Sequence, residues 1–138
     1  MYQILIIEDS KALAERLQLS LQQEGYSVLI ASNGYEGLKS IKNLPPDLVI
    51  TDILMPVMDG FEVIIYLKKY HPKIQIIAMT SGGYIKANEY LHTMRQFGVD
   101  STLMKPFRDD YLKNIVYELR EKKLAFKQSK KEVKSLNM

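Results

Sequence analysis

The sequence predicts an α/β fold with one doubly wound, parallel sheet of five strands and helices on both of its faces. Three observations predict it. Short apolar runs alternate with helix-like segments along the chain. The connections between them are short, which favours right-handed crossovers between parallel strands. Residues 48–50 are apolar on both faces, as expected for a strand buried inside a covered sheet.

The elements follow one another in a regular order. Ser10 is a suitable N-cap for the first helix, and Gly25 stops it. Asn33-Gly34 predicts a turn before the second helix, and Pro45-Pro46 closes that helix. The expected strands are residues 4–7, 26–30, 48–52, 74–79 and 101–104, and the expected helices are residues 10–25, 35–44, 61–70, 85–97 and from 109 onward.

Length and composition place the chain among ordinary globular domains. Its 138 residues can bury a core, and 46% hydrophobic with 25% charged residues is a typical balance. The absence of cysteine excludes disulfides and thiolate metal sites. The first residues carry no secretion signal and no apolar run could span a bilayer, so we expect a cytoplasmic protein without membrane association.

Positive charge is concentrated near the C-terminus. Residues 121–138 hold six lysines and two glutamates, whereas residues 1–120 hold 13 basic and 14 acidic side chains. We therefore predict a domain over residues 1–120 and a basic helical extension or tail over residues 121–138. The tail is too short to form an output domain. Apart from Phe126, its lysines lack interleaved base-stacking aromatic residues, so we expect no specific nucleic-acid binding.

Polar side chains stand where four of the expected strands end. In chain order they are Glu8 and Asp9, Asp52, Thr80, and Lys105. The carboxyl ends of parallel strands meet at one edge of an open sheet, where such folds place their chemistry. Carboxylates that converge there would repel one another without a cation. Mg²⁺ suits such a site because it accepts carboxylates, waters and phosphate oxygens.

The same residue types suit phosphoryl transfer. Lys105 can hold one phosphoryl oxygen, Thr80 can donate to another, and the Asp52 carboxylate can attack the phosphorus. Each residue also has an ordinary explanation, such as a turn cap for Asp52 or a solvated surface position for Lys105. Four ordinary explanations would have to hold at once at four strand ends, which is improbable, so the pattern favours a phosphoryl-accepting site.

With these residues the chain resembles the receiver domain of two-component response regulators, over roughly residues 3–120. The segments that carry the resemblance are residues 4–10, 51–60, 79–81 and 104–107. The resemblance implies a flavodoxin-like sheet of order 2-1-3-4-5 with five helices. It also implies a phosphoacceptor rather than an enzyme, which receives a phosphoryl group on Asp52 from a histidine kinase or phosphotransfer protein, with Mg²⁺ as cofactor.

The resemblance further implies a role for each site residue. Thr80 would be the switch hydroxyl that moves onto the phosphoryl group, and Lys105 would form an ion pair with that group. The implied metal ligands are Asp9 directly, Glu8 through water, Asp52, and the backbone carbonyl of Leu54.

The chain departs from the family pattern in three places. Thr102 replaces an aromatic residue whose rotation usually reports the active state. The stretch between the fourth and fifth strands is longer than usual near residues 82–84, where two glycines favour a mobile loop. The third is Glu8, where the family more often has aspartate. The resemblance also implies that the residues two after the phosphoacceptor and two after the switch threonine flank the approach of the attacking water. Here they are Leu54 and Gly82, whose side chains cannot orient that water, so we expect slow hydrolysis of the phosphoryl group.

We predict a stand-alone receiver that changes its contacts with a downstream protein target when it is phosphorylated. The alternative is a receiver excised from a larger regulator with a DNA-binding or enzymatic output domain. A flavodoxin-like electron carrier is disfavoured because Glu8-Asp9 occupies the place of its phosphate loop. A phosphatase with an aspartate nucleophile is disfavoured because Leu54 stands where it needs a second carboxylate. Heptad spacing on the last helix permits a homodimer through Leu112, Leu119, Phe126 and Val133.

Overall fold

The computed structural model describes residues 1–55, 58–81 and 86–137, and these residues form one parallel sheet covered by helices on both faces. The strands are β1 (Gln3–Ile7), β2 (Ser27–Ala31), β3 (Leu48–Asp52), β4 (Gln75–Ser81) and β5 (Ser101–Lys105), and the helices are α1 (Lys11–Gln22), α2 (Gly34–Asn43), α3 (Gly60–Tyr70), α4 (Lys86–Gln96) and α5 (Asp109–Leu136). The strand order is β2-β1-β3-β4-β5. The predicted fold class and strand order are confirmed. The loop expected near residues 82–84 lies outside the described residues.

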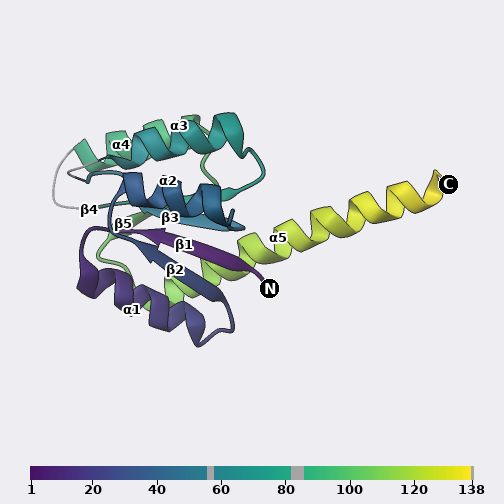
Figure 1. Cartoon of the computed structure of the whole chain (residues 1–138), viewed down its shortest axis with the longest axis horizontal. Helices are drawn as coiled ribbons and strands as arrows, with labels where there is room; N and C mark the ends of the chain where they lie inside the picture. The colour runs from purple at the N-terminus through teal and green to yellow at the C-terminus, as the bar shows by residue number, and fades with distance from the viewer. Residues whose placement is uncertain (56–57, 82–85, 138) are drawn as a thin grey trace.

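The sheet separates two hydrophobic cores (Figure 1). Ile6 of β1 packs on the side covered by α1 and α5, whereas its neighbour Leu5 packs on the side covered by α2, α3 and α4. Every residue of β3 is buried, as predicted for a strand covered on both faces. Full burial of one such aliphatic side chain stabilises by about 1.5–3 kcal/mol. The carboxyl ends of the strands are therefore held on a well-packed frame.

Two strands extend further toward the carboxyl edge than the sequence pattern predicts. β4 runs to Ser81 and β5 runs to Lys105, because these two residues pair with each other in the parallel ladder. Both residues are polar, so a pattern of apolar residues does not signal their pairing. Ile74 lies before β4 rather than in it, because its N–H closes a turn onto the carbonyl oxygen of His71 at 3.1 Å.

The last helix continues past the edge of the sheet and leaves the domain close to the N-terminus of the chain (Figure 1). Leu112, Val116 and Leu119 in its first half are buried against the sheet. Beyond Lys123 the helix is exposed. The domain boundary after residue 120 stays a prediction. No helix in the described ranges combines the length and the hydrophobicity that crossing a lipid bilayer requires.

Candidate functional site

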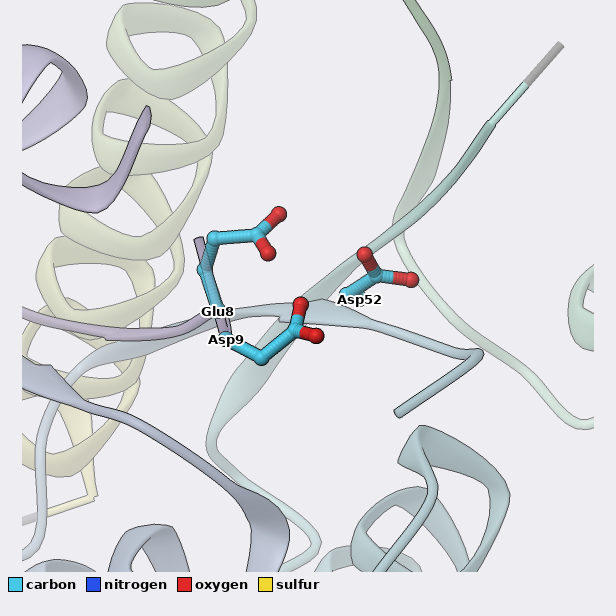
Figure 2. A group of neighbouring side chains, drawn as sticks. All are labelled: Glu8, Asp9 and Asp52. Atoms are coloured by element: carbon cyan, nitrogen blue, oxygen red, sulfur yellow. The ribbon is translucent and has the colours of Figure 1, made fainter. Parts of the chain in front are cut away.

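Three carboxylates converge at the carboxyl edge of the sheet. Glu8 and Asp9 follow β1, and Asp52 ends β3, the strand that pairs beside it. One oxygen atom of each carboxylate lies within 4.8 Å of the others, and Figure 2 shows the three groups gathered together. Glu8 and Asp52 are buried, whereas Asp9 is exposed. The structure thus brings together the acidic residues that the sequence placed at two separate strand ends.

Both carboxylate oxygens of Asp52 have a donor. The Nζ of Lys105 lies 2.7 Å from Oδ2, and the backbone N–H of Leu54 donates to Oδ1 over 3.0 Å. Because only 4% of Asp52 is exposed, a charge without partners there would be costly. The two donors offset that cost and fix the orientation of the carboxylate.

The start of α3 closes tightly against the end of β3. Asp59 caps the helix, and its side chain accepts from the N–H of Glu62 at 3.1 Å. The N–H of Gly60 donates to the carbonyl oxygen of Ile53 at 3.1 Å. A Cβ atom at Gly60 would lie 2.7 Å from the Cα of Ile53 and would collide with the carbonyl group of Asp52. This close approach requires glycine, and it fixes the backbone just after Asp52.

Lys105 joins two of the three carboxylates. Its Nζ contacts Glu8 as well as Asp52, and the second oxygen of Glu8 accepts from the N–H of Ser10 at 3.0 Å. Burial lowers the pKa of Lys105, but the hydrogen bonds to Asp52 and Glu8 outweigh burial and raise this pKa above its ordinary value. The pKa of Glu8 is raised above its ordinary value. Burial is the largest cause and the hydrogen bond with the carboxyl of Asp9 is the next, whereas Lys105 lowers this pKa. The sequence predicted Lys105 at the site but not its bond to Glu8.

Thr80 brings an unpaired hydroxyl to the same edge of the sheet. It lies in β4, opposite Met104 of β5, and is fully buried. Among the residues that the structure describes, its Oγ1 is the one buried side-chain polar atom without a hydrogen-bond partner. A buried hydroxyl in this state costs about 1–3 kcal/mol. A ligand oxygen that accepted from Thr80 would remove this cost.

Thr102, at the position where the resemblance expects an aromatic residue, is bound by an arginine. Its Oγ1 accepts from the Nη2 of Arg95 at 3.0 Å and from the Nε of Arg95 at 3.3 Å. The contact joins the last turn of α4 to β5. Arg95 could not be predicted from the sequence, because no spacing or motif signals a contact across the connection between these elements.

The donor set of the acidic cluster suits Mg²⁺. Carboxylate oxygens are the hard ligands that this ion prefers, and it usually keeps several waters. The exposed Asp9 and a groove of about 710 Å³ between α1 and α2, lined in part by Glu8 and Asp9, give water access to the cluster. Lys105 contacts two of the carboxylates, but its single positive charge balances only one of the three negative charges. The cluster could therefore hold a metal ion.

Comparisons with known proteins identify sequence relatives. Residues 4–117 match the family model of the response regulator receiver domain. The chain is 32% identical over 105 residues to the alkaline phosphatase synthesis transcriptional regulatory protein PhoP of Bacillus subtilis, covering 75% of this chain and 42% of PhoP. It is 37% identical over 109 residues to the transcriptional regulatory protein GlrR of Escherichia coli, covering 79% of this chain and 24% of GlrR. The chain thus spans less than half the length of these two relatives.

A solved structure extends the similarity to three dimensions. The response regulator protein TrrA from Thermotoga maritima, in complex with Mg²⁺-BeF, superposes with a TM-score of 0.76 at 34% sequence identity. The superposition covers 86% of this chain and 99% of TrrA.

Proposed function

Because the chain belongs to the response regulator receiver family, we propose that Asp52 accepts a phosphoryl group and that phosphorylation changes the proteins this chain contacts. A receiver domain is a phosphoacceptor module of two-component phosphorelays and not a classical enzyme. The observation that carries the proposal is the 2.7 Å contact between Asp52 and Lys105 inside a cluster of three carboxylates.

Asp52 is the nucleophile of the proposed reaction. One of its carboxylate oxygens attacks the phosphorus of a phosphohistidine and forms a new P–O bond. The P–N bond to the imidazole breaks, and its electron pair returns to the nitrogen. The ammonium group of Lys105 stabilises charge on a phosphoryl oxygen. The N–H of Leu54, which donates to Oδ1, keeps the carboxylate oriented for attack.

Mg²⁺ would be held by the carboxylates of Asp9 and Asp52, by the backbone carbonyl of Leu54, and by Glu8 through water. When bound, the ion supplies positive charge that neutralises the transferred group. Asp9 is exposed and is therefore available as a direct ligand. Glu8 already accepts from Lys105 and from the backbone of Ser10, which supports an indirect role for it.

Thr80 is suited to respond to the phosphorylated state. Its buried hydroxyl has no partner within the described ranges, so a phosphoryl oxygen would remove a cost of about 1–3 kcal/mol. A contact made in only one of two states shifts the equilibrium between them. We infer that this contact shifts β4 and changes the surface that a downstream protein recognises.

The partners follow from the chemistry. Receiver domains partner with histidine kinases, and a histidine kinase or a phosphotransfer protein would supply the phosphoryl group here. A second candidate function is that of the receiver part of a larger transcriptional regulator. Two relatives favour this candidate. PhoP and GlrR are both named transcriptional regulatory proteins, and this chain matches only 42% and 24% of their lengths.

Beryllofluoride, which mimics a phosphoryl group, tests the proposal without a kinase. Wild-type protein, titrated with beryllofluoride and Mg²⁺, should show saturable shifts of the amide resonances of Thr80 and Lys105, and omission of Mg²⁺ should abolish them. Asp52→Asn should not respond, whereas Asp110→Asn, at an exposed carboxylate of α5, should respond like wild type. A saturable response of Asp52→Asn would refute the proposal.

A further inference from the structure

A groove lies at the end of the domain opposite the acidic cluster. It has a volume of about 510 Å³ and forms where α5 passes the turns that precede β4 and β5. Figure 1 shows α5 leaving the domain at this end, where the strands begin. Its lining includes one aromatic residue and five lysines, namely Phe126, Lys73, Lys122, Lys123, Lys127 and Lys130. We call it the α5 groove.

The α5 groove carries positive charge that the domain does not neutralise. Lys123 forms an ion pair with Asp47, with its Nζ 3.0 Å from Oδ1. The groove has one acidic residue in its lining, Asp100, whose carboxylate accepts from the backbone N–H of Ile76 at 2.8 Å. In the part of the chain that the structure describes, four of the five lining lysines have no ion-pair partner: Lys73, Lys122, Lys127 and Lys130.

Phe126 adds an apolar contact within this charge. It is 59% exposed, and the Nζ of Lys130 lies over its ring at 4.9 Å from the centroid. A partner that covered the ring would gain apolar burial, and one that carried carboxylates would also gain the lysine contacts. The groove therefore combines one aromatic anchor with a basic rim, an arrangement that matches an acidic ligand with an apolar side chain.

We propose that the α5 groove binds an acidic segment of a partner polypeptide, in which carboxylates flank one apolar or aromatic side chain. The carboxylates pair with the free lysines, and the apolar side chain packs on Phe126. A second copy of this chain that presented its own α5 groove does not fit, because the two grooves are equally basic and would repel each other. A flat bilayer does not enter a concave groove. The lining offers a single aromatic residue for base stacking, which disfavours a nucleic acid.

The test measures binding of a short, fluorescein-labelled peptide of glutamates around a central phenylalanine, by fluorescence anisotropy at physiological salt. The same peptide with glutamines in place of the glutamates, and an oligothymidylate of equal formal charge, are the comparison probes. The groove variant is Lys127→Glu with Lys130→Glu. The matched control is Lys131→Glu with Lys134→Glu, which makes the same change of charge on the same helix, outside the α5 groove.

We expect wild type to prefer the glutamate peptide over both other probes. The groove variant should bind it about tenfold more weakly, a loss of about 1.4 kcal/mol, because two attractive charge contacts become repulsive. The control variant should bind within about twofold of wild type, and Phe126→Ser should bind more weakly. Circular dichroism checks that all variants remain helical. Asp52→Asn should bind like wild type, so this result is independent of the proposed phosphorylation.

Three outcomes overturn the proposal. Equal losses in the groove and control variants would mean that α5 attracts anions without a defined site. Tighter binding of the oligothymidylate would assign the groove to nucleic acid. Binding of the glutamine peptide as tight as that of the glutamate peptide would show that the lysines contribute nothing.

Discussion

Lys123 of α5 binds Asp47 at two points, with its Nζ 3.0 Å from Oδ1 and 3.3 Å from the backbone carbonyl oxygen. The other carboxylate oxygen of Asp47 accepts from the N–H of Gln3 at 2.8 Å. This contact joins α5, beyond the residues that match the family model, to the segment before β3 and to the start of β1. Burial raises the pKa of Asp47, but Gln3 and Lys123 outweigh it and hold this pKa below its ordinary value of 3.8.

The Asp47 contact should make part of the stability sensitive to acid. The folded-state pKa lies below the unfolded one, so the carboxylate stabilises the fold above about pH 4 and less as the pH falls through the folded-state pKa. At pH 7 we expect Asp47→Asn to lower the free energy of unfolding by about 1–2 kcal/mol. Urea unfolding of both proteins should give converging values in acid. A difference that stays constant from pH 7 into acid would contradict this assignment.

Much of the site could be predicted because its residues stand at ends of buried strands. The run before Asp52 identifies β3, and the topology of a parallel sheet then brings Glu8, Asp9 and Asp52 to one edge. The unpaired hydroxyl of Thr80 could not be predicted, because hydrogen-bond satisfaction depends on every neighbouring atom. The bond between Lys105 and Glu8 depends on side-chain conformation, which strand order leaves open.

The course of α5 shows a second limit of the sequence. Its apolar positions at heptad spacing look alike in the sequence, yet Leu112 and Leu119 are buried in the domain, whereas Phe126 and Val133 are exposed. The helix becomes exposed where it extends past the sheet, and the sequence of α5 does not mark that point. The homodimer seam therefore stays a prediction, with two of its four residues already used by the core.

Mg²⁺ should stabilise wild type, because it binds the native cluster and not the unfolded chain. At one hundred times its dissociation constant the gain is about 2.7 kcal/mol. Asp9→Asn should lose most of this gain and should raise the metal-free Tm, since it relieves repulsion among the carboxylates. Thermal unfolding with and without Mg²⁺ measures both effects, and Glu15→Gln at an exposed position of α1 is the control. An Mg²⁺ response of Asp9→Asn equal to that of wild type would exclude Asp9 as a ligand.

Thr80→Val should separate the resting state from the phosphorylated state. Valine has the same shape but no hydroxyl, so the unphosphorylated variant should be more stable by about 1 kcal/mol. The variant should gain less stability than wild type from beryllofluoride and Mg²⁺. Thr80→Ser, which keeps the hydroxyl, should retain most of the wild-type gain. If Thr80→Val gains as much stability from the mimic as wild type, Thr80 is not the switch.

Leu54 should prolong the life of the phosphoryl group. Leu54 is 50% exposed and lies two residues after Asp52, and its side chain offers neither donor nor acceptor to a water. Asparagine there could orient the attacking water, and one positioned group contributes about 10²-fold to 10⁴-fold at most. We expect slow phosphoryl decay in wild type and faster decay in Leu54→Asn, followed by loss of radiolabel. Fast wild-type decay that Leu54→Asn leaves unchanged would disprove this role; Gly82, the other flanking residue, lies outside the described residues.

The most direct test of the central claim is the intact mass of the protein after incubation with a small-molecule phosphodonor and Mg²⁺. Asp52 has the buried strand-end position, the Lys105 contact and the carboxylate neighbours that phosphoryl transfer requires. Wild type should gain the mass of one phosphoryl group, Asp110→Asn should gain the same, and Asp52→Asn should gain none. A phosphoryl adduct of equal yield on Asp52→Asn would contradict the assignment of Asp52 as the phosphoacceptor.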